Sequence, residues 1–156
     1  MSAFSGSAGR SVNVSSEPVK RCTVDEILDL RWRVLRPGRP IESARYEQDL
    51  LPDTRHWAYR DAEGRVVGCV TVQRTPFPGA DGPVWQLRGM AVDEDLQGMG
   101  IGGDVLVSAV REVAEPIWCN ARERAIPFYA AHGWKIVSEM FDIPDVGPHK
   151  RMVWSP

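Results

Sequence analysis

The chain has 156 residues, of which 43% are hydrophobic and 26% are charged, and its formal net charge at pH 7 is −2. This size and composition are typical of one globular domain. No apolar run approaches the roughly 20 residues that span a bilayer, and a net charge near zero argues against a nucleic-acid partner. We therefore expect no membrane partner and no nucleic-acid partner.

The cysteines and the N-terminal segment add to these exclusions. Cys22, Cys69 and Cys119 are widely spaced and form no C-x-x-C pair, which indicates neither a disulfide framework nor a zinc site. Residues 1–16 are small and polar and lack the apolar stretch of a secretion signal. We expect reduced thiols, no metal, a cytoplasmic location, a flexible tail over residues 1–16 and a single domain over residues 17–156.

The first half of the chain predicts helices beside an antiparallel hairpin. Thr23 and Glu26 form a capping box, which begins a helix, and Pro37 ends it. Gly64 suits the left-handed position of a hairpin turn. The elements expected here are a strand at Val19–Cys22, a helix from Thr23 to Pro37, a weaker helix at residues 42–51, and hairpin strands at residues 56–59 and 66–75.

The second half of the chain alternates strands and helices. Apolar residues between Ile101 and Val113 recur at helical spacing, and Gly133 stands where a helix C-cap is expected. The elements expected here are a strand at residues 84–92, a helix at 100–114, a strand at 117–120, a helix at 124–132, and strands at 134–141 and 149–154. Together they predict an α/β chain with a mixed sheet and helices packed on it.

The most specific motif is LRGMAVDEDLQGMGIGG, residues 87–103, in which a strand and an acidic turn lead into a glycine-rich helix start. A helix N-terminus offers a phosphate unpaired N–H groups and the positive end of the helix dipole. Gly98, Gly100, Gly102 and Gly103 lack a Cβ, so the backbone can approach an anion closely. Gln97 can add a side-chain hydrogen bond. The motif therefore predicts a diphosphate site.

Three kinds of phosphate loop compete for this motif. A Rossmann fingerprint is formally present in Gly98, Gly100 and Gly103, but residues 93–97 separate it from its strand and no acidic residue closes the next strand. A P-loop requires Gly-Lys-Ser/Thr, and Gly103 is followed by Asp104. The third pattern, Gln/Arg-x-x-Gly-x-Gly/Ala, fits residues 97–102 at every constrained position and resembles the acyl-CoA site of the GNAT superfamily of N-acetyltransferases.

A second motif supports this resemblance. The segment AIPFYAAHGW, residues 125–134, is similar to the superfamily's A-x-x-F/L-Y-x-x-x-G-F signature, and the resemblance covers residues 19–154. The segments LRWRVLRPG and FDIPDVGPHKRMV are similar to a bacterial branch of mostly uncharacterised members. The resemblance implies the GNAT fold, a central and mostly antiparallel sheet that is splayed at the cofactor site and carries helices on both faces. It also implies acetyl-CoA (coenzyme A) as the cofactor.

The resemblance assigns binding roles to individual residues. The backbone around Met90 and Val92 would pair with the pantetheine arm like an added strand. Asn120 would hydrogen-bond the pantetheine or the acceptor, unless it is only a strand-end turn residue. Many members carry Asn where this chain has Arg122, which either reaches a phosphate or stays in solvent. The cofactor-binding residues implied are Met90, Ala91, Val92, Gln97, Gly98, Met99, Gly100, Ile101, Gly102, Gly103, Asn120 and Tyr129.

The resemblance also implies a direct attack of the amine on the thioester. Tyr129 is the candidate acid, because a phenol with its ordinary pKa near 10 is protonated at neutral pH; the alternative is a core aromatic. Several relatives place a glutamate where this chain has Gln86, and an amide cannot accept a full proton. For the base, water relayed by backbone carbonyls comes first, His149 second and Glu123 third.

Four arginines border the first helix and the loop after it, which the resemblance places over the acceptor site. They are interpreted as a solvated charged face, and the alternative is that they attract an acidic acceptor. His56 and His132 are assigned no chemistry. The four arginines are Arg31, Arg33, Arg36 and Arg39.

The resulting hypothesis is an enzyme, an N-acetyltransferase that moves an acetyl group from acetyl-CoA to a primary amine of a small molecule or peptide through a ternary complex. The alternative is a non-catalytic acyl-CoA-binding sensor or regulatory module, which the missing strand glutamate favours. Acylation of a protein or of a charged tRNA is a third possibility. A monomer or a homodimer is expected.

Overall fold

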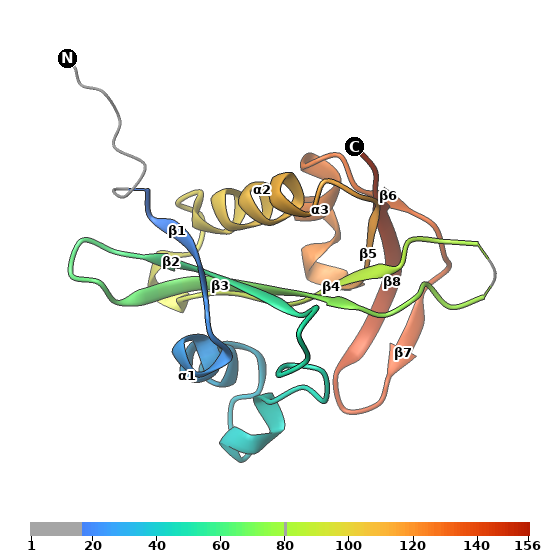
Figure 1. Cartoon of the computed structure of the whole chain (residues 1–156). Coiled ribbons are helices and arrows are strands. Elements are labelled where there is room, and N and C mark those ends of the chain that lie inside the picture. The colour runs from blue at the N-terminus through green and yellow to red at the C-terminus, as the bar shows by residue number, and fades with distance from the viewer. Residues whose placement is uncertain (1–16, 80) are drawn as a thin grey trace.

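A computed structural model describes residues 17–79 and 81–156, which form one mixed sheet with helices on both faces (Figure 1). The tail expected at residues 1–16 lies outside the described residues. The strand order is β1-β2-β3-β4-β5-β8-β6, with β7 pairing β8. The strands are β1 (Val19–Cys22), β2 (Arg55–Arg60), β3 (Val66–Arg74), β4 (Trp85–Val92), β5 (Ile117–Arg122), β6 (Lys135–Ile136), β7 (Phe141–Ile143) and β8 (Gly147–Trp154).

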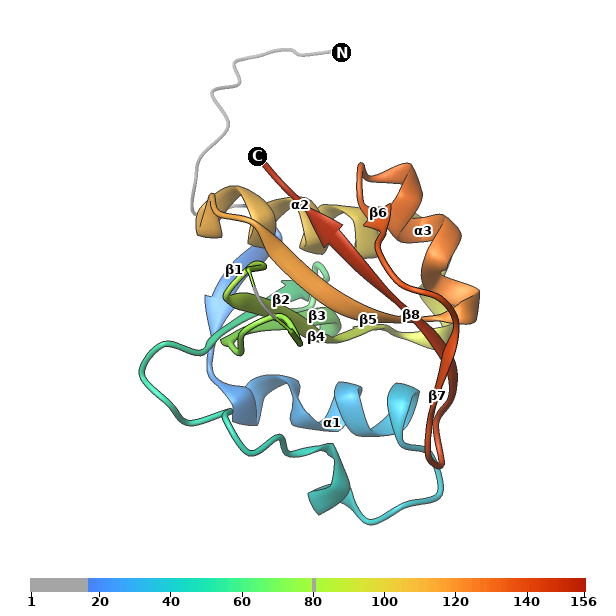
Figure 2. The same cartoon turned by 90° about the vertical axis from the view of Figure 1, so that its right-hand side faces the viewer.

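The helices separate into two layers, as Figure 2 shows. α1 (Val24–Leu35) covers one face of the sheet, and α2 (Ile101–Val113) and α3 (Ile126–Ala131) cover the other. The capping box at the start of α1 is present, since the Thr23 N–H donates to the Glu26 carboxylate at 2.8 Å. Among the described residues, none of the helices combines the length and apolarity needed to cross a bilayer. The predicted fold class is confirmed.

The hydrophobic core is divided unequally by the sheet. The larger cluster lies under α2, where Val105, Leu106 and Ala109 are at most 1% exposed and pack on the strands. The smaller cluster lies under α1 and includes Ile27, Leu30, Ala58, Cys69 and Ala91. Because side chains alternate along β3, Val70 and Val72 face α2 while Cys69 and Thr71 face the α1 side. The α1 face therefore has room for polar groups.

The helix predicted at residues 42–51 is wrong. Only the 3₁₀ turn η2 (Ile41–Ala44) forms, and Arg45 is already extended, with ψ at 133°. The Tyr46 N–H donates to the Asp49 carboxylate at 2.7 Å, which replaces a helical bond. Leu50 is 83% exposed, so the segment has no apolar face that would stabilise a helix.

The single strand predicted at residues 134–141 is also wrong. The Trp134 N–H donates to the Tyr129 carbonyl, so Trp134 belongs to the end of α3. The Ser138 hydroxyl then accepts the Arg151 N–H at 2.7 Å in place of a strand carbonyl. The pairing with β8 is interrupted there, so two short strands, β6 and β7, form in place of one. Before α3, the turn η4 (Glu123–Ala125) takes the first residues of the helix predicted at 124–132.

The sheet opens between β4 and β5, its only parallel neighbours among the described strands. They pair along three residues, Trp85–Leu87 of β4 against Ile117–Cys119 of β5. Beyond Leu87 no further β4–β5 pairing is formed within the described chain, whereas β5 stays paired with β8 as far as Arg122. α2 makes the crossover between the two strands, so its N-terminus lies at the open end. The splayed sheet that was expected is present.

Candidate functional site

Two cavities meet where β4 and β5 separate. One has a volume of about 850 Å³ and lies along the glycine loop and the start of α2. The other, of about 710 Å³, lies against the loop after η2, the ends of β4 and β5, and the loop before β8. We call them the loop cavity and the basic cavity. Both are lined by Leu35, Met90, Arg122 and Ala125.

The four glycines of the loop cavity act in two different ways. Gly98 and Gly100 have φ of +85° and +87°, a conformation that favours glycine, and open space lies where their Cβ atoms would be. A Cβ on Gly102 would lie 3.4 Å from Phe128, and one on Gly103 would lie 2.9 Å from Nε2 of His132. The first two glycines shape the loop, and the other two allow the close approach of α3.

The first turn of α2 opens into the loop cavity. Gly100 caps the helix in a left-handed conformation and supplies no side-chain acceptor for the first N–H groups. Those donors and the helix dipole can therefore serve an anion. Arg122 and Arg124 add positive charge to the wall, and Asp104 contributes a carboxylate. A diphosphate fits this arrangement of donors and cations.

The edge of β4 that faces the opening pairs with no other strand beyond Leu87 among the described residues. The Asp93 N–H donates to the Val67 carbonyl of β3. Since successive residues of a strand point their backbone groups to opposite sides, Val92 and Met90 face away from β3 and toward the opening. The Gln97 side chain donates to the Val92 carbonyl at 3.2 Å. Gln97 therefore caps the strand end in this structure instead of extending into the groove.

A bulge in β4 lies directly beside this edge. The β3–β4 register shifts between Cys69 and Thr71, and Gly89 has φ of +65°. A Cβ on Gly89 would lie 3.1 Å from Nε of Arg31 and 3.2 Å from the Tyr46 ring and hydroxyl. The bulge needs glycine for its conformation and for its packing. It turns the following backbone into the opening.

Both proposed catalytic side chains line the basic cavity, together with Asn120 and Gln86. Tyr129 of α3 is 6% exposed. Burial, and then the nearby Cys119 and Tyr46, raise the pKa of Tyr129 well above its usual value, and Arg122 opposes this shift. The hydroxyl therefore keeps its proton across the neutral range.

His149 reaches the same cavity from β8, where it pairs with Arg122 of β5. It is 3% exposed, and its Nδ1 lies 2.7 Å from the Gly147 carbonyl. A carbonyl only accepts hydrogen bonds, so Nδ1 carries the proton in the neutral ring. Nε2 then bears the lone pair. The geometry gives His149 the tautomer that a general base requires.

Arg122 lines both cavities, and Asn120 lines the basic cavity beside it. The buried Oδ1 of Asn120 has no hydrogen-bond partner among the described residues. A guanidinium nitrogen of Arg122 donates to the Leu35 carbonyl at 3.3 Å. Burial, with a further contribution from Arg124 and Arg36, lowers the pKa of Arg122. Arg122 is therefore not a solvated surface arginine but a partly buried cation between the cavities.

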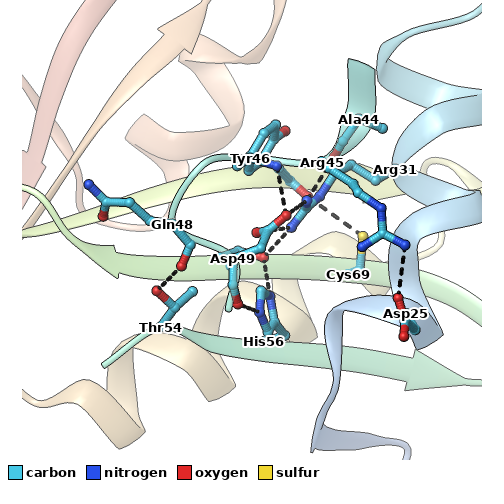
Figure 3. A network of polar contacts seen from close by, with 12 residues as sticks. Asp25, Arg31, Ala44, Arg45, Tyr46, Gln48, Asp49, Thr54, His56 and Cys69 are labelled. Atoms are coloured by element: carbon cyan, nitrogen blue, oxygen red, sulfur yellow. Dashed lines mark hydrogen bonds and ion pairs between the residues drawn. The ribbon is translucent and has the colours of Figure 1, made fainter. Parts of the chain in front are cut away.

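Arg31 is not part of a solvated face, in contrast to the sequence-based interpretation (Figure 3). It is fully buried and pairs with Asp49 at 2.8 Å, and it also donates to the Ala44 carbonyl and to Oγ1 of Thr71. Nδ1 of His56 lies 2.7 Å from the same hydroxyl. This Arg31 network ties the loop over residues 44–49, which walls the basic cavity, to α1 and β3.

The sequence did not single out several residues that line the cavities, among them Tyr46 and His132, and Glu123 was misplaced. Tyr46 lines the basic cavity from a loop that has no periodic pattern, so no local signal marks it. His132 lines the loop cavity, with its Nδ1 on the Phe128 carbonyl at 2.9 Å; the glycine at position 103 was the available signal of a close neighbour. Glu123 is exposed and lines neither cavity.

Solved structures share this architecture. ElaA of Escherichia coli superimposes with a TM-score of 0.67 at 19% identity, covering 93% of each chain. A histone acetyltransferase HPA2-related protein of Corynebacterium glutamicum gives 0.71 at 18% identity, covering 88% of this chain and 95% of its own. An aminoglycoside 6'-N-acetyltransferase in complex with coenzyme A gives 0.68 at 19% identity, covering 86% and 94%. The fold is that of acyl-CoA N-acyltransferases.

The sequence comparisons identify the family. The Acetyltransferase (GNAT) family matches residues 24–134. The chain is 32% identical over 136 residues to the uncharacterized N-acetyltransferase YitI of Bacillus subtilis (strain 168), a match that covers 84% of this chain and 91% of YitI. The chain therefore belongs to the GNAT family. It is an acyltransferase that uses an acyl-CoA donor and an amine acceptor.

Proposed function

We propose that the protein transfers an acetyl group from acetyl-CoA to a primary amine of a small molecule or short peptide, within a ternary complex. The observation that carries this proposal is the meeting of the loop cavity and the basic cavity at the β4 bulge. A donor in one cavity and an acceptor in the other would bring their reactive ends together where β4 is unpaired. Such alignment is a major part of bimolecular catalysis.

The loop cavity suits coenzyme A. The N–H groups at the start of α2, with Gly98 and Gly100, would hold the diphosphate, and Arg124 would neutralise part of its charge. The outward backbone groups of Met90 and Val92 would pair with the pantetheine amides as an added strand. His132, whose Nε2 is free beside Gly103, would contribute a further hydrogen bond.

Three groups of the chain divide the chemistry among them. When bound, acetyl-CoA supplies an activated acetyl thioester. Nε2 of His149 accepts the proton that the amine loses as its nitrogen bonds to the acyl carbon. The Tyr129 hydroxyl donates a proton to the sulfur as the carbon–sulfur bond breaks. A backbone N–H of Met90 or Val92 stabilises negative charge on the acyl oxygen. The proton taken by His149 returns to Tyr129 through solvent, so the chain ends unchanged.

Product analysis tests this function. The protein is mixed with acetyl-CoA and a library of amines, amino acids and short peptides, and both the free thiol and the acetylated product are measured. We expect thiol release that depends on the amine and matches the acetylated product. Binding of acetyl-CoA without amine-dependent release across the library would instead favour the non-catalytic sensor.

A further inference from the structure

The basic cavity is lined by four arginines that come from four different parts of the fold. Arg36 ends α1, Arg45 follows η2, Arg88 lies in β4 and Arg122 ends β5. Among the described lining residues, Glu47 is the only carboxylate. The wall therefore has an excess of three positive charges, whereas the whole chain has a net charge of −2. The positive charge is concentrated at this cavity.

Most of this charge is not neutralised within the protein. Arg45 pairs with Asp25 at 3.1 Å, but Arg36, Arg88 and Arg122 form no ion pair in the described part of the chain. The buried Nε of Arg36 has no hydrogen-bond partner there. Arginine side chains that gather without carboxylates repel one another, as the lowered pKa of Arg122 reflects in part. A cavity that keeps such charge is suited to an anion.

Arg88 is held in place beside the β4 bulge. It lies one residue before the Gly89 bulge, and its guanidinium carbon is 4.0 Å from the centroid of the Tyr46 ring. The guanidinium carbon of Arg31 is 3.9 Å from the same centroid. Figure 3 shows Tyr46 beside Arg31 and Asp49 in the Arg31 network. This stacking fixes the ring and orients Arg88 beside the cavity.

We infer that the amine acceptor carries an oxyanionic group, a carboxylate or a phosphate, which Arg88 binds together with Arg36 and Arg122. The guanidinium fork matches the two oxygens of such a group. The Tyr46 hydroxyl donates to the same group, since burial raises the pKa of this phenol and keeps it protonated. This inference rests on the proposed function and names the class of its acceptor.

Paired acceptors test the inference. Each amino acid in the library is compared with its carboxamide, which has the same amine and shape but no charge, and 2-aminoethyl phosphate is compared with ethanolamine. We expect the anionic member of the preferred pair to have a kcat/KM roughly tenfold higher or more. The carboxylate and phosphate pairs show which anion is preferred. Amides that react as well as acids, or better, would overturn the inference.

Variants of Arg88 show where the preference arises. Arg88→Gln removes the charge, and Arg88→Lys keeps the charge but removes the fork. We expect Arg88→Gln to lower the acid-to-amide ratio of kcat/KM by about tenfold, chiefly through KM, and Arg88→Lys to restore it in part. Arg111→Gln, on an exposed position of α2 outside both cavities, is the matched control and should leave the ratio unchanged. An unchanged ratio in Arg88→Gln would contradict the role of Arg88.

Equilibrium binding separates this inference from the proposed function. The same pairs are titrated into the protein loaded with coenzyme A and followed by calorimetry, which requires no turnover. Tighter binding of the anionic member supports the inference even if no acetylated product forms. Equal binding of both members, or binding of neither, overturns it even if neutral amines are acetylated.

Discussion

At the scale of single residues, the site depends on two side chains, one whose protonation is set by burial and one whose tautomer is set by a hydrogen bond. Tyr129 is held as a phenol by desolvation, because ionising it in the interior costs free energy. His149 is held with its proton on Nδ1 by the Gly147 carbonyl. The proposed acid and the proposed base therefore line one cavity. Two substitutions test their roles.

Tyr129→Phe removes the proposed acid and keeps the ring. Because the hydroxyl has no hydrogen-bond partner within the described chain, we expect the fold to be retained and kcat to fall by about 10²-fold, with acetyl-CoA affinity unchanged. Steady-state kinetics and calorimetry measure the two effects. Tyr59→Phe, outside the two cavities, is the control. Unaltered turnover would show that Tyr129 is only a core aromatic.

His149→Gln removes the proposed base and keeps a hydrogen-bonding side chain. We expect kcat/KM at neutral pH to fall by about 10²-fold. Steady-state kinetics measure this effect in both proteins. A variant that loses less than about threefold would instead support water as the base.

At the scale of elements, the loop that follows η2 is positioned by buried polar groups instead of by a helix. Arg31 pairs with Asp49, donates to Thr71, and is linked through that hydroxyl to His56. Nε2 of His56 lies 3.1 Å from the Asp49 carbonyl, so it carries the proton, and Nδ1 accepts from Thr71. Each of these hydrogen bonds joins a donor to an acceptor, and Nε of Arg31 is the one guanidinium nitrogen without a partner among the described residues. The loop is held where Tyr46 can wall the basic cavity.

Arg31→Met tests the importance of this circuit for stability. The substitution leaves Asp49 buried without its charge partner, and we expect the free energy of unfolding to fall by about 3–5 kcal/mol. Urea denaturation measures it. Arg33→Met is the matched control, because Arg33 forms an exposed pair with Asp29 that contributes about 1 kcal/mol or less. Equal decreases in the free energy of unfolding in the two variants would show that the buried Arg31 network contributes no more than an exposed ion pair.

His56 should make stability depend on pH. Burial is the main cause that lowers the pKa of His56 below its usual 6.5, so the unfolded chain binds a proton more readily than the folded one. The free energy of unfolding should therefore be highest above about pH 6.5 and should fall as the pH drops below it. Urea denaturation between pH 5 and pH 8 measures this slope. A slope that persists undiminished in His56→Gln would assign it to other groups.

The elements differ in how well the sequence predicted them. The capping box and helical periodicity marked α1 and α2 correctly, because these signals act within one turn. The pairing of Arg31 with Asp49 links residues 18 positions apart across a loop without periodicity. No local sequence pattern therefore predicts this ion pair. The same is true of the four arginines of the basic cavity, which the fold alone brings together.

At the scale of the whole molecule, the described sheet is continuous except between β4 and β5, where the two strands separate. Pairing between β4 and β5 stops after Leu87 and Cys119, and α2 connects the two strands with its N-terminus at the gap. The glycine loop was recognisable in the sequence because its chemistry is carried by backbone and by consecutive positions. The basic cavity was not, because loops and strand ends far apart in the chain build it.

Calorimetric titration of acetyl-CoA into the wild-type protein and into Gly100→Val tests whether the glycine loop binds the cofactor. A side chain at Gly100 conflicts with its φ of +87° and fills the space that the loop leaves open. The account predicts that the wild type binds one equivalent and that the variant loses at least about tenfold in affinity while remaining folded. Absence of binding to the wild type, or equal affinity in both proteins, would contradict it.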